Sequence, residues 1–168
     1  MRIISLLPSA TESLCLIGAG PEIVGRSHEC DHPASLADRP VLTAARTEFT
    51  TSADVDRAVT EALDAGRSLY RLDAEKVREL APDLIVTQDL CEVCSIDLDT
   101  VRGVAQTLDP APEVVSLNPQ SFEGVLDDIL ALGKATGREQ EADDALFELR
   151  DRFFTAADHV NPYDEHPP

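Results

Sequence analysis

Short apolar runs alternate with longer amphipathic stretches along most of this chain of 168 residues. Each apolar run spans only a few residues and is bounded by polar residues, glycine or proline. Runs of this kind are typical of strands buried on both faces of a parallel sheet. We therefore expect four strands, at residues 2–7, 22–26, 83–87 and 113–117.

Between these runs, apolar residues recur at the three- and four-residue spacing of amphipathic helices. Ser9 and Glu12 have the spacing of a capping box, so we expect Ser9 to cap the first helix, which ends at Gly18. Residues 33–51 contain two prolines and are expected to be irregular. The other expected helices lie at 52–65, 74–81, 97–108, 122–136 and 138–158.

Strands that alternate with helices predict the α/β class. We expect an open, Rossmann-like parallel sheet flanked by helices, with right-handed crossovers, ending in one long helix. The length suits a single domain with a sizeable core, and we find no internal repeat.

The formal charge of −18 comes from 32 acidic against 14 basic residues, so nucleic acid is not an expected partner. Such acidity is typical of adaptation to high salt, where screening weakens self-repulsion. An acidic surface built for a basic partner is the alternative.

No run approaches the roughly 20 apolar residues needed to span a bilayer, so membrane insertion is not expected. The apolar start is short and broken by Pro8, unlike a signal peptide. As written, the chain is expected in the cytoplasm, where cysteines stay reduced. If a leader has been removed, the expected location is extracytoplasmic.

Two loops that follow predicted strands carry most of the candidate chemistry: 27–33 (SHECDHP) and 87–94 (TQDLCEVC). Ligands bind outside the carboxyl ends of the strands in an open parallel sheet, so both loops are expected at the binding edge. A metal such as zinc or iron could bridge His28, Cys30, Cys91 and Cys94. The alternatives are a redox pair at Cys91 and Cys94, or a polar loop with incidental thiols.

The turn at Pro8, Ser9 and Thr11 adds hydroxyl groups and free backbone N–H groups at a helix N-terminus on the same edge. No nucleophile–base pair can be recognised, so we do not expect an enzyme.

Five segments in this order resemble the substrate-binding proteins of vitamin B12 and iron–siderophore ABC transporters, and the two loops resemble a cobalamin-binding-protein-like branch. The resemblance implies two Rossmann-like lobes joined by a rigid helix, with the ligand between them. This chain would be the N-terminal lobe (1–137), followed by the inter-lobe helix (138–160) and a frayed tail (161–168). The five segments are 2–12 (RIISLLPSATE), 23–33 (IVGRSHECDHP), 72–75 (LDAE), 80–86 (LAPDLIV) and 132–139 (LGKATGRE).

The resemblance implies non-covalent binding of cobalamin or an iron chelate. Glu29 falls where B12 binders place a tyrosine, and Glu75 matches the acid that docks onto an arginine pocket of the permease. The expected partners are a small-molecule ligand, a permease, and a second lobe or a homodimer mate. The expected ligand-facing residues are Pro8, Ser9, Thr11, His28, Glu29, Gln88 and Asp89. The alternative function is a cytoplasmic metal or redox sensor that uses the His/Cys cluster on the same fold.

Overall fold

The computed structural model describes residues 1–46, 51–64, 68–89 and 96–160. Its main sheet has four parallel strands in the order β2-β1-β5-β6. In the register of the sheet, Ile3 pairs with both Ile23 and Leu84, and Leu84 pairs with Glu113. The four strands are β1 (Ile3–Ser5), β2 (Ile23–Arg26), β5 (Leu84–Thr87) and β6 (Glu113–Ser116). All four expected strands and the α/β class are confirmed.

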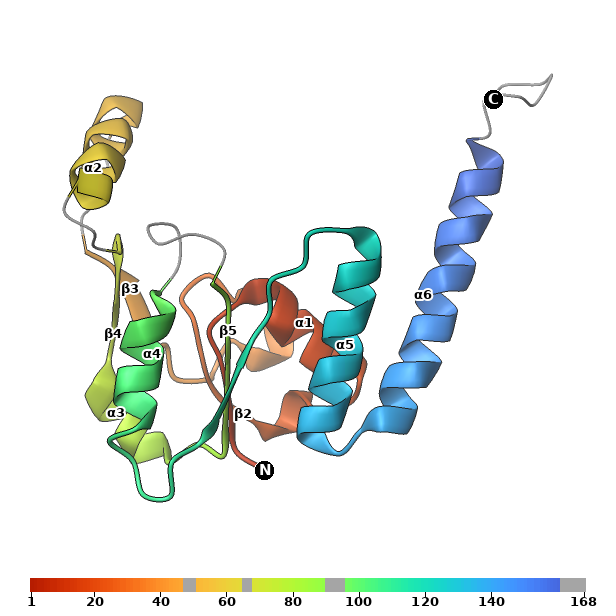
Figure 1. The fold of residues 1–168 in the computed structure, drawn as a ribbon, viewed down its shortest axis with the longest axis horizontal. Coiled ribbons are helices and arrows are strands. Elements are labelled where there is room, and N and C mark those ends of the chain that lie inside the picture. Colours follow the sequence, from red (N-terminus) through yellow and green to blue (C-terminus); the bar gives the residue numbers. More distant parts are fainter. Residues whose placement is uncertain (47–50, 65–67, 90–95, 161–168) are drawn as a thin grey trace.

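Helices cover both faces of this sheet (Figure 1). One layer holds α1 (Pro8–Leu16), α5 (Phe122–Thr136) and α6 (Glu139–His159), and the other holds α3 (Ala74–Leu80) and α4 (Leu98–Ala105). Helix α2 (Ser52–Asp64) stands apart from both layers, and two short 3-10 turns, Gly20–Glu22 and Ala34–Leu36, complete the fold.

Consecutive residues of β1 belong to two hydrophobic clusters, one on each face of the main sheet. Ile3 packs with Leu14 of α1 and Leu132 of α5, whereas Ile4 packs with Val77 of α3 and Val101 of α4. Both isoleucines are completely buried. A central strand that packs on both sides explains why the sequence shows a continuous apolar run there.

The segment 33–51 was expected to be irregular, and this expectation is wrong at one place. Strand β3 (Thr43–Ala45) pairs antiparallel with β4 (Tyr70–Leu72) and forms a separate two-stranded sheet. An isolated bridge between Arg26, at the end of β2, and Val41 joins the main sheet to the segment just before β3. Strands of three residues are too short to show a period of two in the sequence.

The first helix begins earlier than the capping-box pattern predicts. Leu7 is the N-cap and makes no side-chain cap, and Pro8 occupies the first turn. Proline is favoured there because its φ suits the helix and no N–H group is lost. Ser9 therefore lies inside the helix, and its predicted capping role is wrong.

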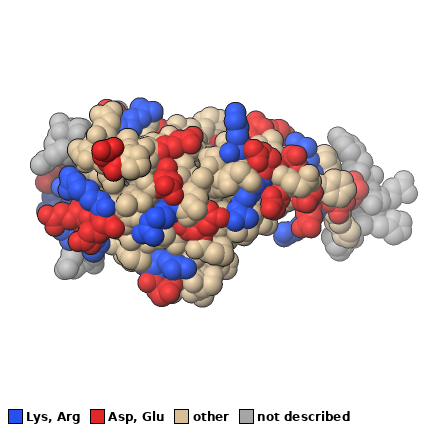
Figure 2. Space-filling model, turned by 90° about the horizontal axis from the view of Figure 1, so that it is seen from below, with Lys and Arg blue, Asp and Glu red and all other residues tan. Residues whose placement is uncertain are grey.

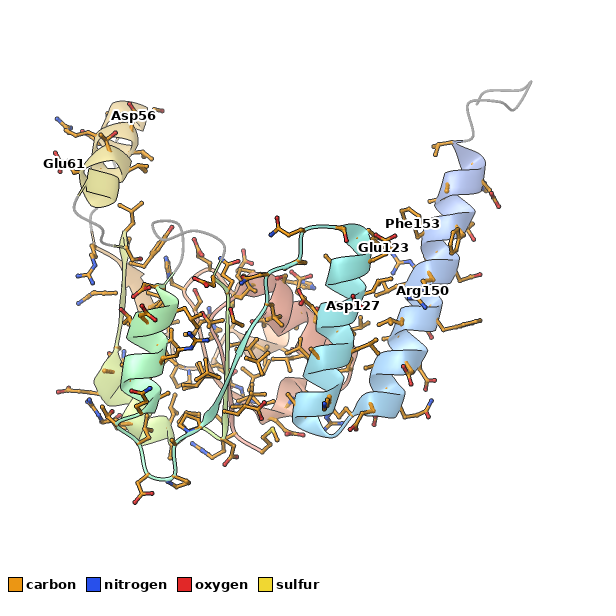
Figure 3. All side chains as sticks on the ribbon, in the orientation of Figure 1. Asp56, Glu61, Glu123, Asp127, Arg150 and Phe153 are labelled. Atoms are coloured by element: carbon orange, nitrogen blue, oxygen red, sulfur yellow. The ribbon has the colours of Figure 1, made fainter. Side chains whose placement is uncertain are left out.

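Helix α6 runs antiparallel to α5 and continues past the beginning of α5 (Figure 1). Its first half packs into the core through Ala142 and Leu146. In its second half Phe153 points towards α5 and stacks on Phe122, with ring centroids 4.4 Å apart (Figure 3). The predicted long helix is present with nearly the expected bounds, whereas the predicted tail 161–168 lies outside the described residues. No described helix is both long and apolar enough to cross a membrane.

Candidate functional site

Loops from three strands meet at the carboxyl edge of the main sheet, around one shallow depression. Pro8 follows β1, His28 and Glu29 follow β2, and Gln88 follows β5, and all four line the depression. It encloses only about 10 Å³, roughly the space of one water molecule. A guest larger than water would therefore lie over this surface rather than inside it.

Six further residues line the depression and were not among the predicted site residues. Thr43 and Tyr70 come from the antiparallel β3–β4 pair, which the sequence pattern did not reveal. Tyr70 is one of only two tyrosines in the chain, and this rarity is the signal that could have singled it out. The six residues are Leu6, Leu7, Ser27, Thr43, Tyr70 and Ile96.

The hydroxyl group of Thr43 holds His28 in place. Thr43 Oγ1 accepts a hydrogen bond from the His28 backbone N–H (3.0 Å) and lies 2.7 Å from His28 Nδ1. It also donates to Ser27 Oγ at 3.1 Å. Thr43 and Ser27 are both buried, whereas His28 is exposed. The buried Thr43 hydroxyl group thus fixes the Nδ1 side of the His28 imidazole ring.

Arg26 fixes the backbone of the same loop. Its guanidinium group donates to the carbonyl oxygens of Ser27 (3.2 Å), Cys30 (3.0 Å), Leu36 (3.1 Å) and Ala37 (3.2 Å). Because these carbonyls belong to both ends of the loop, one side chain sets the conformation that presents His28 and Glu29.

Glu29 and Tyr70 meet above the depression. The Tyr70 hydroxyl group donates a hydrogen bond to Glu29 Oε1 at 3.3 Å. The rings of Tyr70 and His28 lie with centroids 5.2 Å apart, tilted by 49°. The chain has glutamate where the resemblance implies a tyrosine, but β4 supplies a phenol at the same edge.

The predicted role of Thr11 does not fit its position. Thr11 is completely buried, and its hydroxyl group bonds to Ser5 Oγ (2.8 Å) and to the Leu7 carbonyl oxygen (3.1 Å). It ties α1 to β1 beneath the surface. Ser9 and Asp89 are exposed, and the Asp89 N–H donates to Asn118 Oδ1 at 2.7 Å, which joins the loops after β5 and β6.

Cys30 lies inward from the depression rather than in it. Its thiol is 2% exposed, and Sγ lies 3.8 Å from the Ser5 carbonyl oxygen. Burial raises the pKa of this thiol, which disfavours the thiolate that metals bind. Cys91 and Cys94 lie outside the described residues, and within the described ranges no three His, Cys, Asp or Glu side chains are grouped to hold a metal ion.

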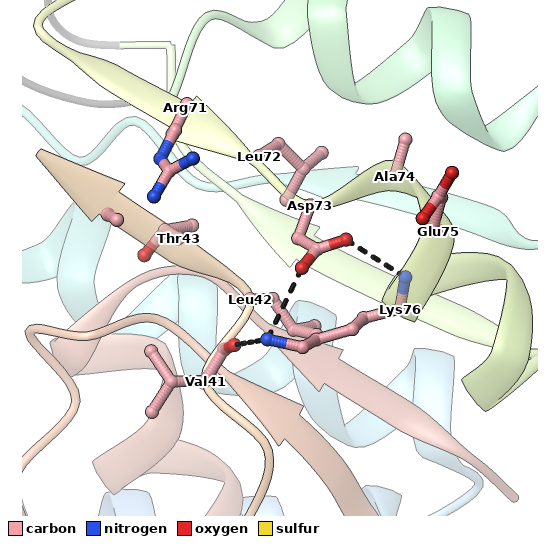
Figure 4. Close-up of a pocket in the computed structure, with 10 residues that line it drawn as sticks. Val41, Leu42, Thr43, Arg71, Leu72, Asp73, Ala74, Glu75 and Lys76 are labelled. Atoms are coloured by element: carbon pink, nitrogen blue, oxygen red, sulfur yellow. Dashed lines mark hydrogen bonds and ion pairs between the residues drawn. The ribbon is translucent and has the colours of Figure 1, made fainter. Parts of the chain in front are cut away.

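Glu75 is exposed in the first turn of α3, beside a separate groove between that helix and the β3–β4 strand pair. Figure 4 shows this groove, with Arg71 over one side and Glu75 at the other. Asp73 caps α3 through the Lys76 N–H (3.1 Å) and pairs with Lys76 Nζ (3.2 Å). Asp73 is thus the N-cap of α3.

Acidic side chains are distributed widely over the molecule. The face seen from below in Figure 2 carries many of them, interspersed with arginine and lysine. This view shows mixed charge rather than one continuous patch.

A sequence profile described as periplasmic binding protein matches residues 3–164, nearly the whole chain. The chain belongs to the periplasmic binding protein family. This result confirms the family resemblance drawn from the sequence, and the family is one of binding proteins rather than enzymes. No curated protein matches the chain by sequence.

Solved structures of periplasmic binding proteins share the fold. A possible iron-binding, periplasmic solute-binding protein from Staphylococcus epidermidis is 25% identical with a TM-score of 0.69, covering 98% of this chain and 53% of its own. The heme-binding protein HutB of Vibrio cholerae is 21% identical with a TM-score of 0.68, and the match covers 98% of this chain and 51% of HutB. The vitamin B12-binding protein BtuF of Vibrio cholerae is 20% identical with a TM-score of 0.63, and the match covers 95% of this chain and 51% of BtuF. The chain thus spans about half the length of these structures.

Proposed function

We propose that this chain is one lobe of a solute-binding protein of an ABC-type uptake system, and that it binds cobalamin or an iron chelate, heme included, without covalent chemistry. One observation carries the proposal: the polar side chains of His28, Glu29 and Gln88 meet on one exposed surface at the carboxyl edge of the sheet. This edge is where open parallel sheets bind ligands. The names of the similar structures support the ligand class.

The shallowness of the site supports a second surface above it. A depression of about 10 Å³ cannot enclose a macrocycle, and ligand sites bury most of the ligand surface. We propose that a second lobe, or a second copy of the chain, covers the other side of the guest. The doubled length of the similar structures favours a second lobe.

The proposal is tested by binding hydroxocobalamin, hemin and a ferric siderophore to the full chain, followed by their absorption spectra and by thermal unfolding. A guest present at 100 times its Kd is expected to stabilise the chain by about 2.7 kcal/mol. Glu29→Ala combined with His28→Ala should weaken the binding. The matched control is Glu113→Ala, because Glu113 begins β6 at the opposite edge of the sheet. Failure of all three guests to bind, or equal loss in the control, would refute the proposal.

For Glu75 we propose docking to a permease through charge-assisted hydrogen bonds with arginine. Its exposure beside the groove in Figure 4 supports this role. An acidic residue in the first turn of a helix is also favoured by the helix dipole. Glu75→Gln should therefore reduce uptake in a reconstituted transporter by more than it reduces stability.

A further inference from the structure

Aromatic side chains gather on helices α5 and α6, away from the sheet edge. The chain has five phenylalanines and no tryptophan, and four of the five phenylalanines lie on these two helices. Phe147 and Phe154, both on α6, are 76% and 63% exposed. Aromatic residues are enriched at protein–protein interfaces. The exposed part of α6 is therefore the surface to examine for a contact with another molecule.

The two exposed rings belong to one stripe along α6, which we call the outer stripe: Phe147, Arg150, Asp151 and Phe154. The spacing i, i+3, i+4 and i+7 places these four residues on one face of the helix. All four are exposed, and the residues through which α6 packs into the core lie on another face. In Figure 1, α6 stands at one end of the molecule, and no other described element lies beyond it.

The outer stripe is complementary to itself. Two copies of α6 can pack antiparallel about a two-fold axis that passes between Arg150 and Asp151. Phe147 of each copy then faces Phe154 of the other, and Arg150 of each copy faces Asp151 of the other. A two-fold interface requires such self-complementarity, because both copies use the same surface. The order Phe, Arg, Asp, Phe thus supplies two aromatic pairs and two pairs of opposite charge.

The charged residues of the outer stripe are available for these pairs. Within the described part of the chain, no ion pair involves Arg150 or Asp151. Arginine and carboxylate can form two parallel hydrogen bonds, which adds geometric specificity. Asp143 and Asp158 lie beyond the two ends of the stripe and would face each other across the same axis. Both are exposed, so salt screens their repulsion.

We propose that the outer stripe of α6 is a contact surface for a second copy of this chain, packed antiparallel. Four phenylalanine rings, two from each copy, form its apolar centre, and the Arg150–Asp151 pairs set its register. The stripe spans only about 10 Å along the helix, so the contact belongs to the small, transient class of interface. No residue of α6 lines the depression at the sheet edge, so this inference does not rest on the proposed function.

Sedimentation equilibrium of the full chain in 1 M KCl tests the proposal. The Debye length is about 3 Å at this ionic strength, which screens the repulsion between two chains that each carry a charge of −18. We expect a dimer whose fraction rises with chain concentration. Phe147→Ala combined with Phe154→Ala should raise the Kd of the dimer at least about 30-fold, as expected for the loss of an interface hot spot.

An exchange of charges tests the register. Arg150→Asp places two carboxylates opposite each other in both pairs and should weaken the dimer. Arg150→Asp combined with Asp151→Arg restores both pairs at the net charge of the parent, so it should restore the dimer. Arg152→Asp is the matched control, because Arg152 is exposed on the same helix but outside the stripe. This control should leave the Kd of the dimer unchanged.

Four results would overturn the proposal. The first is a parent chain that stays monomeric up to about 1 mM, where even a weak contact populates a dimer. The second is a dimer that survives the loss of both phenylalanines. The third is an exchanged variant that stays monomeric although circular dichroism shows the helix content of the parent. The last is an equal effect of Arg152→Asp and Arg150→Asp, which would assign the contact to a different face of α6.

Discussion

Gly133 of α5 and Ala142 of α6 lie in close contact. A Cβ atom built on Gly133 would lie 2.5 Å from Ala142 Cβ and 3.1 Å from the Arg138 carbonyl oxygen. Both residues are buried, so neither helix can move aside without opening the core. The absence of a side chain at this position sets the distance between the two helices.

Gly133→Ala is therefore expected to destabilise the chain by about 1–3 kcal/mol, the usual cost of overpacking, although alanine is the better helix former. The matched control is Gly103→Ala in α4, where a new Cβ meets nothing within 4 Å. That change should stabilise by about 0.4–1 kcal/mol. Chemical denaturation of both variants measures the difference, and equal effects would contradict this account of the helix contact.

At the level of residues, the sequence predicted the site residues that follow the main-sheet strands better than those that come from β3 and β4. His28, Glu29 and Gln88 directly follow strands of the main sheet, so their position at the binding edge could be predicted. Thr43 and Tyr70 reach the same edge from the β3–β4 strand pair, whose strands are too short to show a period of two in the sequence. Thr11 was expected to face a ligand but is buried, because a hydroxyl group near a helix start can bond inward as easily as it can point outward.

At the level of elements, the central strands β1 and β5 were predicted correctly because every residue in them is buried, which gives a continuous apolar run. The outer strands β2 and β6 are only partly buried, and their short apolar runs were still sufficient to predict them. The ends of helices were harder to predict. The capping-box pattern placed the cap of α1 at Ser9, whereas the helix already begins at Pro8. The start of α6 is fixed by a long-range contact that no local pattern contains. Arg138 Nη2 donates to Glu22 Oε1 at 2.5 Å and so joins the turn before β2 to α6.

This contact makes stability depend on pH. The hydrogen bond from Arg138 holds the pKa of Glu22 below its usual value of 4.5. A carboxyl group whose pKa is lowered in the folded state stabilises that state. The contribution is complete above the pKa of the unfolded chain and is lost as the pH falls through the lower pKa of the folded chain. Glu22→Gln should thus destabilise the chain at pH 7.

The difference between the parent and Glu22→Gln should shrink as the pH falls below 4.5. Urea unfolding of both chains, at pH values above and below 4.5, measures this difference in the free energy of unfolding. Glu79→Gln, at an exposed position on α3, is the control and should show no comparable dependence. A constant difference at all pH values would argue against the Glu22–Arg138 contact as its source.

At the level of the whole molecule, the dominant property is the charge of −18. Like charges spread over one surface repel each other in the folded state. Salt shortens the range of this repulsion from about 30 Å at 0.01 M to about 3 Å at 1 M.

We therefore expect the Tm of the chain to rise between 0.01 M and 1 M KCl. Thermal unfolding followed by circular dichroism measures the change. NaCl serves as the comparison, because screening depends on ionic strength rather than on the identity of the cation. A Tm that falls with added KCl would count against the interpretation of the acidity as adaptation to high salt.

The small sheet of β3 and β4 has a broader consequence. It supplies Thr43 and Tyr70 to the depression and forms a sheet of its own, separate from the main sheet. Side-chain hydrogen bonds of Thr43 and Tyr70 hold it against the loop after β2. Under the proposed function, the main sheet would carry the fold and the β3–β4 pair would contribute to the choice of guest. Exchange of residues 41–73 between relatives should transfer ligand preference while the scaffold remains unaltered.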